Sequence, residues 1–161
     1  MKEKLLYPVF RPILIYSILL TLFFQKIKKV IRLKKLHEYF IVFAFGSVLY
    51  GLVEVLFRGH THWTMFLLGG LVFSVLYKLD LQMGNKNFVL KCSVGSVIIS
   101  SMEFLCGYVV NVQLKMHVWD YSGIKFNVLG QICPKYVAVW FLLCIPAYML
   151  GDLIRKKAIG R

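Results

Sequence analysis

The chain has 161 residues, of which 59% are hydrophobic and 17% charged, and its formal net charge is +13. Soluble domains contain about 45–50% apolar and about 25% charged residues, and a chain of this length cannot bury so much apolar surface in one water-soluble core. The composition therefore excludes a soluble domain, a disordered chain and a disulfide-rich secreted module, and it predicts an integral membrane protein.

Five apolar stretches are long enough to span a bilayer, which takes about 20 helical residues for roughly 30 Å of hydrocarbon. In chain order they are Leu5–Phe24, Tyr39–Phe57, Met65–Leu81, Phe88–Val110 and Tyr136–Ile154. Pro8, Arg11 and Pro12 interrupt the first stretch, which we interpret as a tilted span, with a re-entrant segment as the alternative. The sequence thus predicts an all-α polytopic membrane protein with a single membrane domain, residues 1–161. Within it, residues 1–38 form an N-terminal span and a basic segment, and residues 39–157 form a four-span core.

The connection Gln25–Glu38 between the first two predicted spans carries six Lys and Arg residues. Its apolar residues, among them Ile27, Val30 and Ile31, fall near helical spacing, and the basic residues fill the other face. This pattern predicts a helix on the membrane surface against anionic lipid headgroups. The alternative is a solvated basic loop that only orients the protein.

Lys and Arg are distributed unevenly between the two sides of the predicted membrane domain. Thirteen of the 20 lie on the side of the Gln25–Glu38 connection and the C-terminal tail. The positive-inside rule therefore places the C-terminus in the cytoplasm and the N-terminus outside the cell membrane. A nucleic-acid partner is excluded, because the basic residues lie at the ends of apolar runs and not on one exposed face with aromatic residues between them.

The second and fourth predicted spans repeat each other at an offset of 49 residues. Gly46-Ser47-Val48 aligns with Gly95-Ser96-Val97, and Glu54 aligns with Glu103. Each copy continues into an outward loop with a tryptophan and then into a returning span. The core is therefore predicted as two tandem helical hairpins, related as a parallel internal repeat.

The two aligned glutamates are the main candidates for a functional site, because carboxylates inside a membrane are rare and costly. Glu103 has no basic residue three or four positions away, so its carboxyl group must be protonated, hydrated or paired with another helix. Glu54 has Arg58 at position i+4, a favourable arrangement for an ion pair. We expect both glutamates to line one outward-facing cavity, in a binding or proton-relay role or in a structural one.

Two outward loops supply the remaining candidates. The first, Arg58–Trp63, has a guanidinium, two imidazoles and an indole within six residues. The second, Val118–Asn127, is rich in polar and aromatic groups. A metal site is not predicted, because zinc needs three or four ligands and the loops favour hydrogen bonding near the headgroups. The tryptophans are expected at the membrane interface. The complete set of candidate binding residues is Glu54, Arg58, His60, His62, Trp63, Glu103, Trp119, Asp120, Tyr121 and Asn127.

The loop sequences resemble the CmpB-type ABC-transporter permease family (ABC-transporter type IV) between Phe40 and Leu143. The resemblance rests on Tyr50-Gly51, Glu54, Arg58-Gly59, His62-Trp63-Thr64-Met65, Gly69-Gly70, Glu103, Gly107, Trp119-Asp120-Tyr121-Ser122, Phe126-Asn127 and Gly130-Gln131-Ile132-Cys133. Many members carry a G-P-x-x-P-I-Y-G run where this chain has His60–Met65, so the chain looks like a variant branch. The resemblance implies a compact four-span core and a separate P-loop ATPase subunit, since this chain contains no GxxxxGK[ST] motif. It also implies a homo-oligomer or a larger assembly, because an ABC permease half usually has about six spans.

These observations favour a transport-associated, permease-like membrane subunit that needs no cofactor. Its paired glutamates would line an outward-facing polar cavity, and Glu54, Arg58 and Glu103 would set the charge selectivity. The first alternative is a membrane enzyme that acts on a lipid-linked substrate, with Asp120, His62 and Glu103 as acid–base groups. The second is a membrane scaffold with no site.

Overall fold

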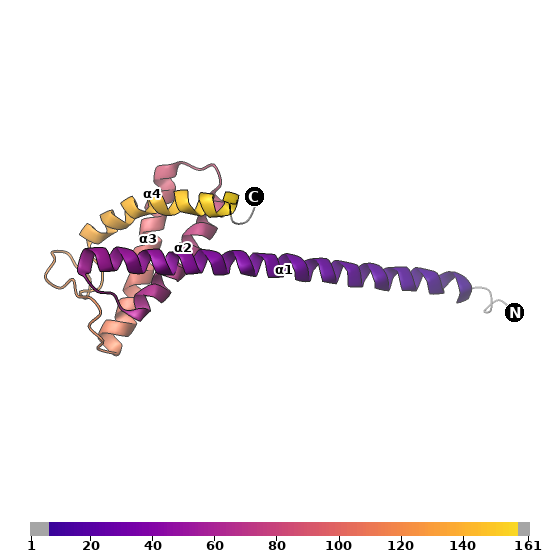
Figure 1. Cartoon of the computed structure of the whole chain (residues 1–161), viewed down its shortest axis with the longest axis horizontal. Helices are drawn as coiled ribbons and strands as arrows, with labels where there is room; N and C mark the ends of the chain where they lie inside the picture. The colour runs from indigo at the N-terminus through magenta and orange to yellow at the C-terminus, as the bar shows by residue number, and fades with distance from the viewer. Residues whose placement is uncertain (1–6, 158–161) are drawn as a thin grey trace. The chain divides into compact units, whose positions relative to one another are not determined.

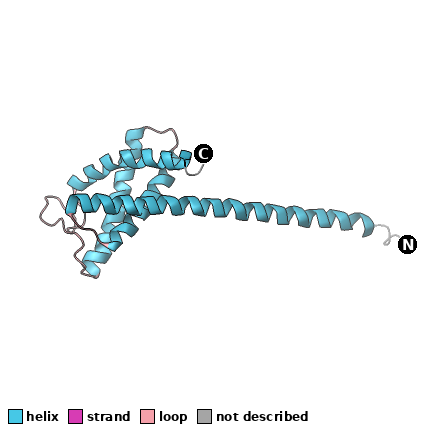
Figure 2. Ribbon diagram, in the orientation of Figure 1, coloured by secondary structure: helices cyan, strands magenta, loops and turns pink. Residues whose placement is uncertain are grey.

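The computed structural model describes the backbone of residues 7–157 and the side chains of Thr21, Gln25 and residues 35–156. The chain divides into two compact units, Met1–Glu38 and Tyr39–Arg161, and the second unit is called the core below. The helices are α1 (Tyr7–Arg58), α2 (Trp63–Met83), α3 (Phe88–Gly107), the π-helical η2 (Tyr108–Gln113) and α4 (Pro134–Lys157) (Figure 1). Apart from one isolated bridge between Val128 and Ile132, the regular structure of the described residues is helical, which confirms the all-α prediction (Figure 2).

Helix α1 is continuous through the segment Gln25–Glu38, where we had predicted a connection between two spans. No glycine or proline occurs between Ile13 and Phe45, so the sequence contains no strong signal to end a helix there. The predicted span Leu5–Phe24 lies, except for Thr21, outside the described side chains. Its membrane insertion and the surface position of the basic segment therefore stay predictions.

Four helical segments of the described chain are long and apolar enough to cross a membrane. They are Lys35–Arg58, Trp63–Met83, Phe88–Gln113 and Pro134–Lys156. They correspond to the four predicted spans of the core, and this confirms a polytopic architecture. Large apolar side chains such as Leu56 and Phe57 are exposed on the surface of the core, as expected for helices that face lipid.

Glycines allow the helices of the core to approach one another closely. A Cβ atom on Gly46 of α1 would collide with Phe73 and the Gly69 carbonyl of α2, and one on Gly95 of α3 would collide with Cys144 and Tyr148 of α4. Small residues let helix backbones come this close inside a membrane. In both hairpins the glycine meets two residues four positions apart on the returning helix, which supports the predicted repeat.

The loops between the helices place the core's polar residues at two ends. Residues 59–62 and 114–133 lie at the end called the loop end below, while residues 84–87 connect α2 to α3 at the other. His62 caps α2 by accepting a hydrogen bond from the Thr64 amide, and Asn87 caps α3 through the Val89 amide. Gly84 ends α2 with a φ of 51°, a conformation that glycine adopts at little cost.

Candidate functional site

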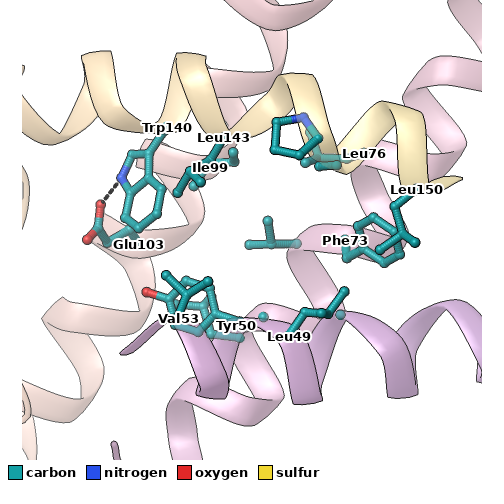
Figure 3. Close-up of a pocket in the computed structure, with 16 residues that line it drawn as sticks. Leu49, Tyr50, Val53, Phe73, Leu76, Ile99, Glu103, Trp140, Leu143 and Leu150 are labelled. Carbon is teal, nitrogen blue, oxygen red and sulfur yellow. Dashed lines mark hydrogen bonds between the residues drawn. The ribbon is translucent and has the colours of Figure 1, made fainter. Parts of the chain in front are cut away.

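A cavity of about 350 Å³ lies among the four helices of the core (Figure 3). All four helices line it, and among the described residues Glu103 contributes its only charged side chain. Figure 3 shows Glu103, Trp140 and Tyr50 toward one end of the cavity and Phe73 and Leu150 toward the other. The lining residues are Gly46, Leu49, Tyr50, Val53, Leu68, Gly69, Val72, Phe73, Leu76, Ile99, Glu103, Trp140, Leu143, Pro146, Ala147 and Leu150.

The Glu103 side chain is 3% exposed and is held by two neutral donors. The Tyr121 hydroxyl donates to Oε1 at 2.9 Å, and the Trp140 indole Nε1 donates to Oε2 at 2.7 Å. One carboxylate thereby links α3 to α4 and to the loop between them. Among the described residues, no Lys, Arg or His forms an ion pair with Glu103.

Aromatic rings surround this carboxylate. The ring centroids of Tyr50 and Trp140 are 6.1 Å apart, and those of Tyr136 and Trp140 are 6.4 Å apart. Tyr121 stacks on Tyr136 at 4.4 Å. Burial raises the pKa of the Tyr121 phenol, and the negative charge of Glu103 raises it further, so this hydroxyl remains a donor.

Glu54 has a different environment from its repeat partner and is not among the residues that line the cavity. Its Oε1 accepts from Arg58 at 2.7 Å, the ion pair that the i+4 spacing predicted, and its Oε2 accepts from Thr61. Arg58 also donates to the Val118 carbonyl at 2.6 Å, so Glu54 and Arg58 tie the two loops together. Of the two glutamates expected in one cavity, only Glu103 lines it, because Arg58 and Thr61 engage Glu54 at the loop end.

The other candidates of the first loop stay at its surface. His60 is exposed, His62 caps α2, and Trp63 is 60% exposed, as expected for an interfacial residue. No group of three His, Cys, Asp or Glu side chains in the described part of the chain is arranged to hold a metal ion.

The second loop buries a residue that we had expected at the interface. Trp119 is 5% exposed, and its indole donates to the Gln131 carbonyl at 3.1 Å, because the loop folds back over its own aromatic side chain. Asn111 of η2 donates to the Gln131 side chain at 2.8 Å and accepts from the Val118 amide at 2.7 Å. This network was not predicted from the sequence, although an amide side chain at the end of an apolar helix is a usable signal.

Asp120 and Asn127 shape the turns of this loop. Asp120 accepts from the amide and the hydroxyl of Ser122, and these two hydrogen bonds lower the pKa of its carboxyl group. Asn127 donates to the Ile124 carbonyl at 2.7 Å and accepts from the Gly130 amide at 2.9 Å. Both residues therefore perform the turn role that their types favour.

A cluster of charged residues at the opposite end of the core was missed. Buried Asp80 on α2 accepts from Lys91 of α3 and from Arg155 of α4, each at 2.7 Å, and Arg155 also pairs with exposed Asp152. We call these four residues the Asp80 cluster. From the sequence, Lys91 and Arg155 were interpreted only as charges that orient the protein. The available signal was a single aspartate within the apolar stretch Met65–Leu81.

Comparison with known proteins places the chain in a sequence family. No solved structure matches the chain. The model of a family described as Putative ABC-transporter type IV matches residues 42–159, which include α2, α3, α4 and the part of α1 that lines the cavity. With its four apolar helices and this match over most of its length, the chain is a multi-pass membrane protein of a transport-associated kind, and it belongs to the ABC-transporter type IV family.

Proposed function

We propose that the protein is a transport-associated, permease-like subunit whose central cavity receives the apolar part of a membrane-dissolved molecule. The observation that carries this proposal is a 350 Å³ space lined by apolar side chains from four helices, with one carboxylate at its end. Small-molecule sites are commonly cavities of about 300–1,000 Å³ with mostly apolar walls and a few placed polar groups.

The composition of the lining changes the kind of ligand that the sequence suggested. A cavity with paired glutamates would suit an ion or a small polar solute. The cavity here has one carboxylate, two side chains with a polar tip, Tyr50 and Trp140, and otherwise apolar walls. A molecule with an apolar body and one polar group complements this arrangement, with the polar group beside Glu103.

Family membership and the absence of a P-loop motif support the assembly part of the proposal. An ABC-type transporter needs an ATPase, and we propose that a separate subunit supplies it. With four core spans, the protein would complete a pathway as a homo-oligomer or in a larger assembly, surrounded by lipids with anionic headgroups.

The geometry offers less support for an enzyme. Asp120 accepts two hydrogen bonds from Ser122, and His62 is engaged with Thr64 as the cap of α2. Neither side chain has a hydrogen bond to Glu103 among the described contacts. The acid–base groups of the enzyme hypothesis, Asp120, His62 and Glu103, therefore do not form one hydrogen-bonded group, and each has a separate structural role.

A cavity-filling substitution tests the proposal. Ala147 lines the cavity, so Ala147→Phe is expected to reduce the amount of small molecule that native mass spectrometry detects on protein purified in mild detergent. Leu142→Phe, an exposed position on the same helix, is the matched control and should retain the wild-type amount. Equal retention in both variants, or no bound molecule in the wild type, would contradict the proposal.

The ATPase partner is tested separately. A tagged chain extracted gently from its native membrane should co-purify with a stoichiometric protein that carries a P-loop motif. Recovery of the chain as a lone homo-oligomer would contradict this part of the proposal and leave ligand binding to be judged by the cavity experiment.

A further inference from the structure

We infer that the cavity binds an organic cation, with the positive group beside Glu103 and an apolar body along the remaining wall. This inference rests on the proposed function, because it names the class of molecule that the same cavity would take. Three observations carry it: the charge of the lining, the hydrogen bonding of Glu103 and the aromatic rings at its end of the cavity.

The charge of the lining favours a cation over an anion or a neutral molecule. Of the described residues that line the cavity, none is Lys, Arg or His, and Glu103 is the one acidic group. The other buried carboxylates described in the core differ: Glu54 pairs with Arg58, and Asp80 pairs with Lys91. A carboxylate without an ion pair in an apolar site is stabilised by a positive ligand, whereas an anion would be repelled.

The hydrogen bonds of Glu103 hold its carboxylate in one orientation. Tyr121 and Trp140 donate to different oxygens, so the carboxylate cannot rotate without losing both bonds. Each oxygen of a carboxylate has two lone pairs. One donor at each oxygen leaves a second lone pair, which can contact a positive group. The Glu103 carboxylate, called the anchor below, is therefore fixed in place while it remains able to contact a cationic group.

The aromatic residues supply the second element of cation recognition. Tyr50 and Trp140 line the cavity together with Glu103, and their ring centroids are 6.1 Å apart. Aromatic rings attract cations within about 6 Å of their centroids, and they are used to bind quaternary ammonium groups. Figure 3 shows the Tyr50 and Trp140 side chains toward the same end of the cavity as Glu103, so a cation that contacts Glu103 from within the cavity is expected near both rings.

The rest of the wall determines the body of the ligand. Beyond Glu103, Tyr50 and Trp140 the lining residues that the structure describes are apolar or glycine, among them Leu49, Phe73 and Leu150. These side chains make no hydrogen bonds, so they stabilise an alkyl or aryl body in proportion to the apolar area that it buries. A lipophilic ammonium compound satisfies both ends of the cavity.

The experiment compares matched probes on the whole protein in phosphatidylcholine nanodiscs. Octyltrimethylammonium is the cation, 2,2-dimethyldecane is its uncharged isostere, and octyl sulfate is the anion. Equilibrium dialysis of each radiolabelled probe gives binding after subtraction of empty nanodiscs. We expect the cation to bind saturably at one site per chain, at least tenfold more tightly than either comparison probe.

Variants then assign the preference to the site. Glu103→Gln should weaken cation binding at least tenfold, and Glu103→Asp, which keeps the charge, should restore part of it. Asp152→Asn removes one negative charge at an exposed position of the Asp80 cluster and should bind the cation like the wild type. Tyr50→Leu should weaken binding of the cation several-fold and leave binding of the uncharged isostere unchanged. If the Glu103 variants fail to fold, Tyr50→Leu alone tests the inference.

The outcomes separate this inference from the proposed function. If the uncharged isostere binds as tightly as the cation, or if Tyr50→Leu and Glu103→Gln leave the preference intact, the cation inference is wrong and the cavity proposal stands. If no probe binds above the empty nanodiscs, both are wrong.

Discussion

Buried carboxylates at opposite ends of the core are stabilised by different kinds of residue. Asp80 is neutralised by two cations, Lys91 and Arg155, whereas Glu103 is held by the neutral donors Tyr121 and Trp140. The charge of an ion-paired carboxylate is already compensated, so it attracts a charged ligand only weakly. A carboxyl group held only by neutral donors has no compensating cation, so a positive ligand can still supply one, and the two ends are expected to respond differently to substitution.

Asp80→Asn should strongly destabilise the protein. The substitution leaves Lys91 and Arg155 without their shared buried partner, and losing one member of a buried pair costs about 3–5 kcal/mol. Unfolding in mixed micelles with increasing SDS would measure the change in the free energy of unfolding. Asp152→Asn is the control, since this exposed partner of Arg155 should contribute about 0–1 kcal/mol. Similar losses in both variants would show that burial of Asp80 does not matter.

Two stacked tyrosines offer a matched test of the Glu103 anchor. The Tyr121 hydroxyl donates to Glu103, whereas no hydrogen bond is seen from the Tyr136 hydroxyl within the described residues. Tyr121→Phe should lower the free energy of unfolding by about 1.5–3 kcal/mol, the range for a hydrogen bond to a charged group. Tyr136→Phe keeps the stacked ring and should leave stability nearly unchanged. An equal effect of both substitutions would contradict the assigned bond.

At this scale the sequence predicted the anchor but not its partners. Glu103 stood out because a carboxylate in an apolar span needs compensation, and Arg58 was found because it lies one helical turn from Glu54. Tyr121 and Trp140 lie 18 and 37 residues from Glu103, and only the folding of α4 and its loop brings them together. Periodicity carries no information about contacts at such separations.

Among the elements, the helices themselves were the most predictable part. Their length and hydropathy determine four spans, and Gly84 and the caps at His62 and Asn87 mark ends that local chemistry explains. The π-helical turn η2 was not predicted, and the hydrogen bonds of its Asn111 go to Val118 and Gln131 in the loop, contacts that no local pattern reveals. Continuity of α1 was also missed, since a run of lysines suggested a connection where no residue ends the helix.

The glycine contacts between helices give a prediction at this scale. Gly46→Ala and Gly95→Ala should each destabilise the protein by about 1–3 kcal/mol, because the added methyl group overpacks an interface. Gly151→Ala is the control: its methyl group would make only an ordinary contact with Tyr77, and better helix propensity should offset any loss. The measurement is again the free energy of unfolding in mixed micelles. Comparable losses at Gly46 and Gly95, with none at Gly151, would also support the internal repeat.

For the whole molecule, membrane orientation rests on the distribution of basic residues. The loop end, with residues 59–62 and 114–133, is predicted to face outward and the Asp80 cluster to face the cytoplasm. The four apolar helices establish that the chain crosses the membrane, but the fold of a helical bundle is the same in either orientation. Orientation is therefore decided by loop charge, which the sequence shows and the fold does not.

Introduced cysteines can test this orientation. Gly123 in the second loop and Lys86 in the α2–α3 connection are both exposed, whereas Cys92, Cys133 and Cys144 are buried. A membrane-impermeant maleimide added to intact cells should label Gly123→Cys and not Lys86→Cys. The unmodified chain provides the background, including that of partly buried Cys106. Labelling at Lys86→Cys alone would place the loop end in the cytoplasm.

The order of the helices in the chain, with α4 after α2 and α3, has a consequence for how the protein is made. A ribosome delivers α2 and α3 before α4, so Asp80 and Glu103 reach the membrane ahead of Arg155 and Trp140. Until α4 arrives, Glu103 lacks an indole donor and Asp80 lacks its second cation, and exposure of such groups to lipid is costly. The last helix therefore completes both ends of the core at once. A nascent chain that stops before Pro134 would remain a substrate for membrane quality control.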